Sequence, residues 1–333
     1  MIRILHRTPR GVIRRVQPAE LKPGLLRASQ GTLWLDFESE PIESCEPILR
    51  DVFHFHPLAI DDALRETHIP KLDDWGKYLY IAFHAVSFKV EDGARVDTDE
   101  VDFFLGDGYL VSHHDEKIPI LDHVWDRCDR DPRILGEGPD HALYVVLDEL
   151  VNSYMGAFQS IDEAVDELED EILESSGRQT LASIFSLRRA LVQLRRTLAP
   201  QREVLNSLSR GEYSVIDARD RIYFRDVYDH VVRLFDINES MRDQVSGALE
   251  TSLSATNNRM NEIMKTLTLI TTLFMPISFI ASFFGMNFFS PSIPLGNWTG
   301  RAAFLVTLVL TAAIPLSFYA WFHRQGWVKE RGS

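Results

Sequence analysis

One helical segment near the C-terminus carries polar and sulfur-containing side chains on a single face. Their spacing of three or four residues places them in one stripe along a helix, which comprises Asn261, Met264, Thr268, Thr271, Met275, Ser278 and Ser282. The opposite face consists mainly of isoleucine and leucine. The stripe leads into the triplet Gly285-Met286-Asn287, and an uncharged loop follows. Uncharged oxygen atoms on one face of an apolar helix are suited to line a path for a hydrated ion.

The same side chains also have a purely structural interpretation. Threonine and serine in membrane helices often donate to the preceding turn or lie at helix contacts. Asn287 is suited to cap the end of a helix, because asparagine tolerates the left-handed conformation. Two helices cannot enclose a water-filled path, so an ion path along this stripe requires several subunits in a ring.

The charged residues are strongly segregated along the chain. The 333 residues carry a formal net charge of -14, yet residues 266–300 and 302–321 contain no Asp, Glu, Lys or Arg. Each of these two segments holds an apolar run close to the roughly 20 residues that span a bilayer as a helix. We therefore expect two transmembrane helices at the C-terminal end of a large acidic part. Two buried helices of a soluble domain are the alternative.

The basic residues that flank the two apolar runs predict their orientation. Arg259 and Lys265 precede the first run, several basic residues follow the second, and Arg301 alone lies beside the loop. Because cytoplasmic segments of membrane proteins carry an excess of Lys and Arg, we expect both termini in the cytosol and the loop outside. The predicted location is the cell (inner) membrane.

The larger part of the chain divides into a mixed and a helical region. Short β-branched and aromatic runs such as "GTLWLDF", "YLYIAFHAVSF" and "EVDFFLGDGYLVSHH" predict strands, with helices around His56-Pro57, and therefore an α/β domain. From about residue 140, apolar residues recur at steps of three and four, which indicates long amphipathic helices. A helix over residues 217–284 would be roughly 100 Å long at about 1.5 Å per residue, so we expect a stalk in an oligomer.

These patterns give a domain organisation. We expect a cytosolic α/β domain over 1–135, a helical stalk over 140–265, a first transmembrane helix over 266–285, an external loop over 286–300, a second transmembrane helix over 301–322 and a basic cytosolic tail over 323–333. The acidic balance argues against nucleic acid as a partner. No Walker pattern is present. We expect no enzymatic step and no organic cofactor.

Several motifs together resemble the CorA family of divalent-cation channels. They are "HPLAIDDAL", "YFRDVYDH", "MRDQVSG", "NEIMKTLT" and "FMPISFIASFFGMNF". The resemblance implies a homopentamer in the lipid bilayer that conducts Mg²⁺ and also Co²⁺ and Ni²⁺. It implies that Gly285, Met286 and Asn287 form the outer mouth of the pore, where neutral amide oxygens hold the hydrated ion. Mg²⁺ fits this, because it gives up its water reluctantly.

The resemblance also assigns roles inside the pore and in the cytosol. It implies polar pore positions at Asn261, Thr271 and Ser278 and a hydrophobic gate at Met264 and Leu267, which blocks ions by dewetting. Met275 belongs to the same pore stripe. Cytosolic Mg²⁺ is expected to bind between subunits and close the pore, at carboxylates that repel one another when no ion is bound. The matching acids are Asp61, Asp62, Asp148 and Asp226.

Two departures from the family pattern and two rival functions remain. The loop "FFSPSIPLGNW" holds no acid, and the tail "HRQGWVKERG" has fewer cations than the lysine cluster of the family. A zinc or other transition-metal transporter of the same superfamily is one rival, which the intact Gly-Met-Asn triplet disfavours. The histidines His54, His56, His113 and His114 show no zinc-ligand spacing. The other rival is a membrane-anchored coiled-coil scaffold without an ion path.

Overall fold

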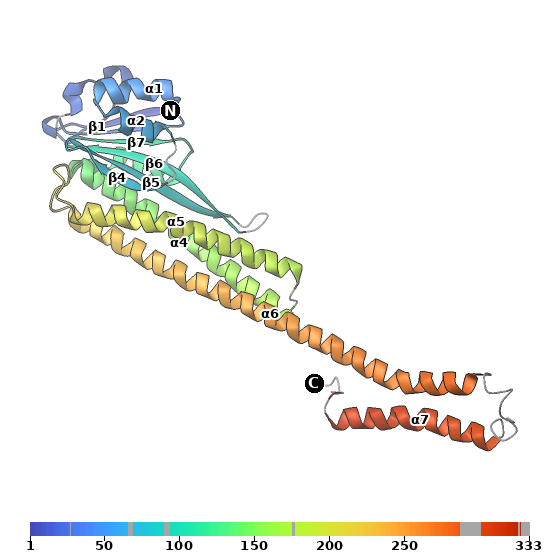
Figure 1. The fold of residues 1–333 in the computed structure, drawn as a ribbon. Helices are drawn as coiled ribbons and strands as arrows, with labels where there is room; N and C mark the ends of the chain where they lie inside the picture. Colours follow the sequence, from blue (N-terminus) through green and yellow to red (C-terminus); the bar gives the residue numbers. More distant parts are fainter. Residues whose placement is uncertain are drawn as a thin grey trace. The chain divides into compact units, whose positions relative to one another are not determined.

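The computed structural model describes residues 1–26, 28–65, 69–89, 94–174, 177–286, 301–325 and 327. The chain forms two compact units, Met1–Ser252 and Leu253–Ser333. The first unit contains a seven-stranded sheet and most of the helices (Figure 1). The second unit contains the end of one long helix and a final helix.

The sheet has the strand order β2-β1-β3-β7-β6-β5-β4. All neighbouring strands are antiparallel except β3 and β7, which are parallel. The strands are β1 (Ile2–Arg7), β2 (Ile13–Arg15), β3 (Thr32–Glu38), β4 (Lys71–Asp74), β5 (Tyr78–Lys89), β6 (Arg95–Gly106) and β7 (Tyr109–His114). The three predicted runs are strands, and a short turn joins β6 to β7. The basic N-terminal segment adds β1 and β2, which the sequence pattern did not indicate.

One face of the sheet is covered by short helices, α1 (Ile42–Pro47) and α2 (Pro57–Leu64), joined by a π-helical turn over Ile48–Val52 (Figure 1). Pro57 opens α2, where its missing N–H costs no hydrogen bond. The His56 Nδ1 atom accepts a hydrogen bond from the Leu58 N–H at 3.2 Å and caps the helix. The first unit also contains short 3₁₀ turns, at Pro18–Glu20, Pro23–Leu26, Ala28–Gln30 and Ile134–Gly136.

The other face is covered by α3 (Pro119–Arg130), α4 (Pro139–Glu174) and α5 (Arg178–Arg210), with the first part of α6 (Arg221–Gly285) packed on α4 and α5 (Figure 1). The predicted apolar face of α4 is buried along its length, from Leu147 to Ile172. Tyr154 of α4 and Gln201 of α5 both donate to the backbone oxygen of His84 in β5, the latter at 2.8 Å. These two hydrogen bonds attach the long helices to the sheet.

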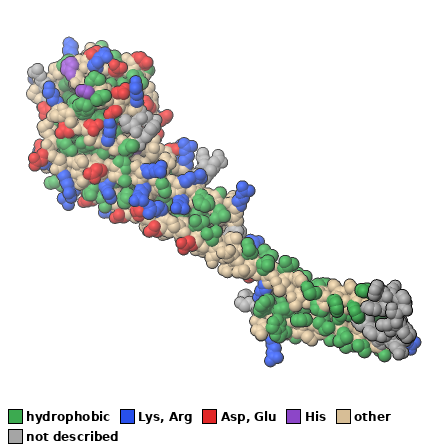
Figure 2. All heavy atoms as spheres, in the orientation of Figure 1, with side chains coloured by type: hydrophobic (Ala, Val, Ile, Leu, Met, Phe, Trp, Pro, Cys, Tyr) green, Lys and Arg blue, Asp and Glu red, His purple; other side chains and the backbone are tan. Residues whose placement is uncertain are grey.

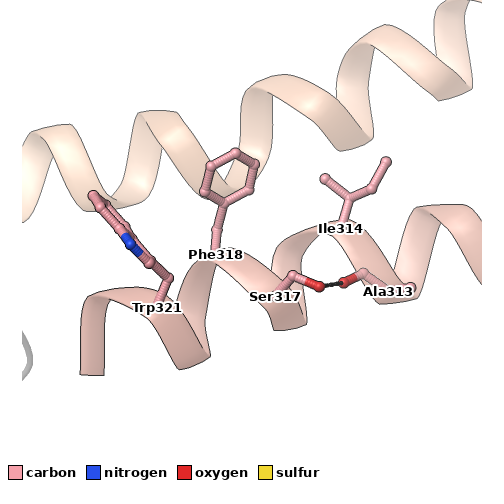
Figure 3. A pocket seen from close by; sticks show the side chains of 5 residues that line it. All are labelled: Ala313, Ile314, Ser317, Phe318 and Trp321. Carbon is pink, nitrogen blue, oxygen red and sulfur yellow. Dashed lines mark hydrogen bonds between the residues drawn. The ribbon is translucent and has the colours of Figure 1, made fainter. Parts of the chain in front are cut away.

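The second unit consists of the rest of α6 and α7 (Arg301–Arg324). Both helices are long and apolar enough to cross a membrane, and their most apolar windows have mean hydropathies of 1.7 and 1.8 with none of the window buried. Hydrophobic side chains cover the surface of both (Figure 2). Ile314, Phe318 and Trp321 project from one side of α7 around an open hollow of about 500 Å³ (Figure 3). Such a large exposed apolar surface requires lipid or further protein around it.

Candidate ion path and cation-sensing residues

The predicted pore stripe lies on one unbroken helix. Helix α6 continues to Gly285, and the side chains of all six predicted pore positions are exposed, namely Asn261, Met264, Leu267, Thr271, Met275 and Ser278. At about 100° per residue these positions fall within one third of the helix circumference, and from Asn261 to Gly285 they extend over roughly 36 Å. Gly285 and Met286 are described, whereas Asn287 lies outside the described residues.

The threonine hydroxyls of this helix are bonded to the preceding turn. The Thr268 hydroxyl donates to the Met264 backbone oxygen at 2.8 Å, and the Thr271 hydroxyl donates to the Leu267 backbone oxygen at 2.9 Å. These are the hydrogen bonds that the purely structural interpretation of the threonines predicts. They do not exclude a lining role, because a hydroxyl oxygen that donates its proton keeps two acceptor lone pairs.

Apolar side chains on the stripe separate its polar positions. Met264, Leu267 and Met275 are 55%, 56% and 65% exposed, and no ionisable residue occurs in α6 beyond Lys265. In a ring of subunits, exposed apolar side chains of this size would form a constriction that repels water. One face of α6 in a single chain therefore carries both neutral oxygen atoms and exposed apolar side chains.

The first acidic pair lies on α2, over the face of the sheet that the short helices cover. Asp61 forms an ion pair with Arg65 at 3.1 Å. Asp62 forms an ion pair with Lys71 of β4, whose ammonium also lies 3.2 Å from Asp73. The same ammonium is 5.2 Å from the centre of the Tyr80 ring. Asp62 is therefore neutralised by a lysine that the sequence pattern did not single out.

The second acidic pair has one member on α4 and the other on α6. Asp148 and Asp226 lie close enough for their charges to interact, beside the stacked rings of Tyr144 and Tyr223, whose centres are 4.9 Å apart. Partial burial raises the pKa of Asp148, the His230 imidazole opposes this, and the Glu149 and Asp226 charges add to it. The His230 Nδ1 atom is 4.0 Å from the nearest Asp148 oxygen. His230 follows Asp226 by one helical turn, a spacing that could have indicated it.

Within one chain the two acidic pairs do not meet. Asp61 and Asp62 lie on the sheet face covered by α2, and Asp148 and Asp226 belong to the helices on the opposite face. In the part of the chain that the structure describes, no group of three or more His, Cys, Asp or Glu side chains is placed to hold a metal ion. A cation site that uses both pairs would therefore need carboxylates from two chains.

An α/β domain, a long helix and two C-terminal apolar helices define a membrane protein with a candidate cation path. The chain belongs to the family described as CorA-like Mg2+ transporter protein, whose model matches residues 29–324. The members of this family transport divalent metal ions, so this chain is a divalent metal transporter of the CorA family.

Individual relatives cover most of the chain. It is 35% identical over 295 residues to YfjQ of Bacillus subtilis (strain 168), which is named as a metal ion transporter, with 88% of this chain and 89% of that protein covered. It is 33% identical over 279 residues to the cobalt/magnesium transport protein CorA of Thermotoga maritima, covering 84% and 78%. The solved CorA magnesium transporter from Methanocaldococcus jannaschii has a TM-score of 0.83 over 98% of this chain and 99% of that chain, at 24% identity. A zinc transport protein, ZntB of Yersinia pseudotuberculosis, is 26% identical over 307 residues.

Proposed function

We propose that this protein is a homopentameric channel for Mg²⁺ influx that also passes Co²⁺ and Ni²⁺. The observation that carries the proposal is the uncharged stripe on α6, because it places neutral oxygens and apolar side chains along one face of a helix that is long enough to cross a membrane. Five copies of the stripe around an axis would enclose the path that one chain cannot form. The ion gradient and the membrane potential would drive the flux.

The chemistry of the stripe suits a hydrated divalent ion. Mg²⁺ prefers octahedral oxygen ligands and loses its water slowly. Asn287, directly after the end of the described part of α6, would supply a ring of amide oxygens that accept hydrogen bonds from the ion's water. Thr271 and Ser278 would supply further oxygens below it, and Met264 and Leu267 would form the gate. The Gly285-Met286-Asn287 triplet is thus the proposed selectivity filter.

Cytosolic Mg²⁺ would close this channel through the two acidic pairs. In the proposed closed state a cation joins Asp61 or Asp62 of one chain to Asp148 or Asp226 of its neighbour, because each pair is incomplete as a site within a single chain. Without the ion, the carboxylates repel one another across the subunit boundary and the ring loosens. Mg²⁺ is therefore both the transported ion and the regulator in this proposal.

Flux through the purified protein in liposomes tests the proposal. We expect Mg²⁺, Co²⁺ and Ni²⁺ to enter, and we expect Asn287→Ala to lower Mg²⁺ flux at least about tenfold, the loss of roughly 1.4 kcal/mol of ion stabilisation. Asn258→Ala, which changes an exposed asparagine of α6 outside the stripe, is the matched control. Unchanged Mg²⁺ flux through Asn287→Ala would refute the filter.

The same liposomes test zinc as an alternative substrate, which the ZntB relatives favour. Zn²⁺ binds most strongly to sulfur and imidazole ligands, and the stripe offers only amide, hydroxyl and thioether groups. We therefore expect Mg²⁺ flux to exceed Zn²⁺ flux. The opposite order would establish a zinc transporter.

A further inference from the structure

Four titratable side chains are buried side by side on the sheet face that α2 covers. They are His84 of β5, Glu100 and Asp102 of β6 and His113 of β7. The strand register explains the grouping, because His84 pairs with Glu100 and His113 pairs with Asp102 across neighbouring strands. Each of the four side chains is no more than 7% exposed. We call this group the buried proton cluster.

The cluster forms two imidazole–carboxylate pairs. The His84 Nε2 atom is 3.8 Å from Glu100 Oε2, and the His113 Nδ1 atom is 3.7 Å from Asp102 Oδ2. The Tyr80 hydroxyl donates to Asp102 Oδ1 at 2.6 Å. A hollow of about 40 Å³, lined by Asp102, His113 and Ala63 of α2 among others, lies beside the pairs. That space can hold at most a few water molecules, and because the four side chains are no more than 7% exposed, bulk water solvates them poorly.

Burial makes the number of protons in this cluster sensitive to pH near neutrality. Desolvation raises the pKa of Asp102 to about 7, and the neighbouring Glu100 charge adds to this, while the nearby His113 imidazole and the hydrogen bond from Tyr80 oppose it. An ordinary aspartate titrates near 4, so Asp102 has moved into the range of the cytosolic pH. Buried ion pairs of this kind cost desolvation energy, and sheet faces are normally apolar. The first unit thus retains a costly polar group that the proposed cation path does not use.

A short series of contacts leads from this cluster to Asp62. Asp102 holds the Tyr80 hydroxyl, the Lys71 ammonium lies 5.2 Å from the centre of the Tyr80 ring, and Lys71 forms the ion pair with Asp62. Other titratable groups surround Asp102, its hollow and the contacts that lead to Asp62. They are Lys71 and Asp73 of β4, Tyr80 and His84 of β5, Asp99 and Glu100 of β6, His113 and His114 of β7, Asp115 and Glu116 after β7, and Asp62 of α2.

We propose that the buried proton cluster is a proton-binding site whose occupancy sets the affinity of Asp62 for a divalent cation. The inference rests on the proposed sensing role of Asp62. When Asp102 loses its proton, its negative charge attracts Lys71 away from Asp62 and also lowers the electrostatic potential around Asp62. Both effects favour a cation at Asp62, so cation binding strengthens as pH rises and weakens as the cytosol acidifies.

Limited proteolysis of the full chain in detergent at pH 6 and pH 8 tests this inference. The quantity compared is the Mg²⁺ concentration that gives half-maximal protection, which does not depend on the activity of the protease. We expect this concentration to be roughly three to ten times lower at pH 8, as one additional screened negative charge near the site would produce. Asp102→Asn should abolish that pH-dependent difference. Asp107→Asn, an exposed acid in the turn between β6 and β7, should retain it.

The outcomes separate the inference from the proposed function. If Mg²⁺ protects the wild-type chain and Asp102→Asn keeps the wild-type pH dependence, the inference is wrong and the sensor stands. If Mg²⁺ gives no protection at either pH, the sensor is refuted and the coupling with it. Should Asp102→Asn fail to fold, Tyr80→Phe keeps the ring near Lys71 and removes the hydroxyl donor. It should move the midpoint of the pH dependence upward, and an unchanged midpoint would overturn the inference.

Discussion

Lys71 forms an ion pair with the carboxylate of Asp62, where the proposed cation site lies. Its ammonium lies between Asp62 and Asp73, and although burial favours the neutral amine, the hydrogen bonds to these two carboxylates raise the pKa of Lys71. Lys71 therefore stays charged across the physiological range. A divalent ion at the proposed Asp62 site would have to displace this ammonium or share the carboxylate with it. Lys71 would therefore set a lower limit to the concentration at which the proposed sensor responds.

Lys71→Met should make the sensor respond at lower Mg²⁺. Removing the competing charge while keeping most of the side-chain volume should lower the half-maximal protective Mg²⁺ concentration about three- to tenfold, since each 1.4 kcal/mol is a factor of ten. Lys77→Met removes the same charge from an exposed position in the neighbouring turn and is the control. An equal shift of the half-maximal Mg²⁺ concentration in both variants would show that the net charge of the protein, and not the contact of Lys71 with Asp62, determines the response.

Asp102 should also make the stability of the first unit depend on pH. Its folded pKa is raised, so the folded state holds the proton more tightly than the unfolded state. The resulting penalty is absent below about pH 4 and complete above about pH 7. Asp102→Asn should therefore gain in thermal midpoint relative to the wild type as pH rises from 5 to 8. We expect a gain of at least about 3 °C, which roughly 1 kcal/mol produces in a domain of this size. A difference that does not vary with pH would contradict the raised pKa.

At the scale of elements, the stripe on α6 can be tested against the opposite side of the same helix. Thr271→Val removes a hydroxyl oxygen from the stripe with little change in shape, and we expect Mg²⁺ flux in liposomes to fall several-fold. Thr266 is also exposed, its hydroxyl donates to the Glu262 backbone oxygen at 2.9 Å, and it faces away from the stripe. Thr266→Val therefore loses the same kind of bond and should leave flux unchanged. Equal losses of Mg²⁺ flux in the two variants would show that the loss comes from a less stable helix and not from a missing pore oxygen.

A second element-scale prediction concerns a polar residue in the core of the helical layer. Asn238 of α6 is fully buried, and among the described residues neither polar atom of its side chain has a hydrogen-bond partner. An unsatisfied buried amide costs about 1–3 kcal/mol. Asn238→Leu should therefore raise the thermal midpoint by several degrees. Asn206→Leu, at a partly exposed position of α5, should change it little. A lower midpoint for Asn238→Leu would show that the amide is satisfied in solution.

The sequence pattern predicted the elements whose periodicity is regular and failed where charges are paired at a distance. The apolar face of α4 was visible because one residue in three or four is buried along its whole length. Strand β1 was not, because Arg3 looks like a surface residue. In the fold its guanidinium binds the buried Asp36 at 2.7 Å. The same limit hid Lys71 beside Asp62 and the cross-strand pair of Asp102 with His113, since these contacts depend on strand register.

At the scale of the whole molecule, two properties of the proposed channel can be tested: the number of chains in the ring and their orientation in the membrane. The stripe needs a closed ring to enclose water, and the resemblance to the CorA family implies five chains in that ring. We therefore expect native mass spectrometry of the protein in detergent to show five chains. A monomer or dimer as the largest species would contradict the pore. The isolated chain leaves the apolar surface of α7 exposed, which also favours an assembly within lipid.

Thiol labelling of intact cells tests the predicted orientation. Cys45 and Cys128 are fully buried, and burial raises the pKa of each thiol to about 12, so both should be unreactive at neutral pH. Because the two native cysteines should not react, any labelling would come from an introduced cysteine. Ser292→Cys should react with a membrane-impermeant reagent from outside. Ser333→Cys should react only after the membrane is opened. External labelling of Ser333→Cys would place the C-terminus outside.

The hydrogen bonds of the α6 threonines have a consequence for the sign of the ion. The hydroxyls of Thr268 and Thr271 donate their hydrogen bonds to backbone oxygens of the preceding turn. They can therefore present only lone pairs to the lumen of the proposed ring. Water bound to a cation directs its hydrogens outward, and water bound to an anion directs its oxygens outward. At the level of these two threonines the wall would only accept hydrogen bonds, so it would match the outer surface of a hydrated cation better than that of a hydrated anion, whereas the amides of Asn261 and Asn287 can also donate. Charge discrimination would then arise in the pore without any charged residue in it.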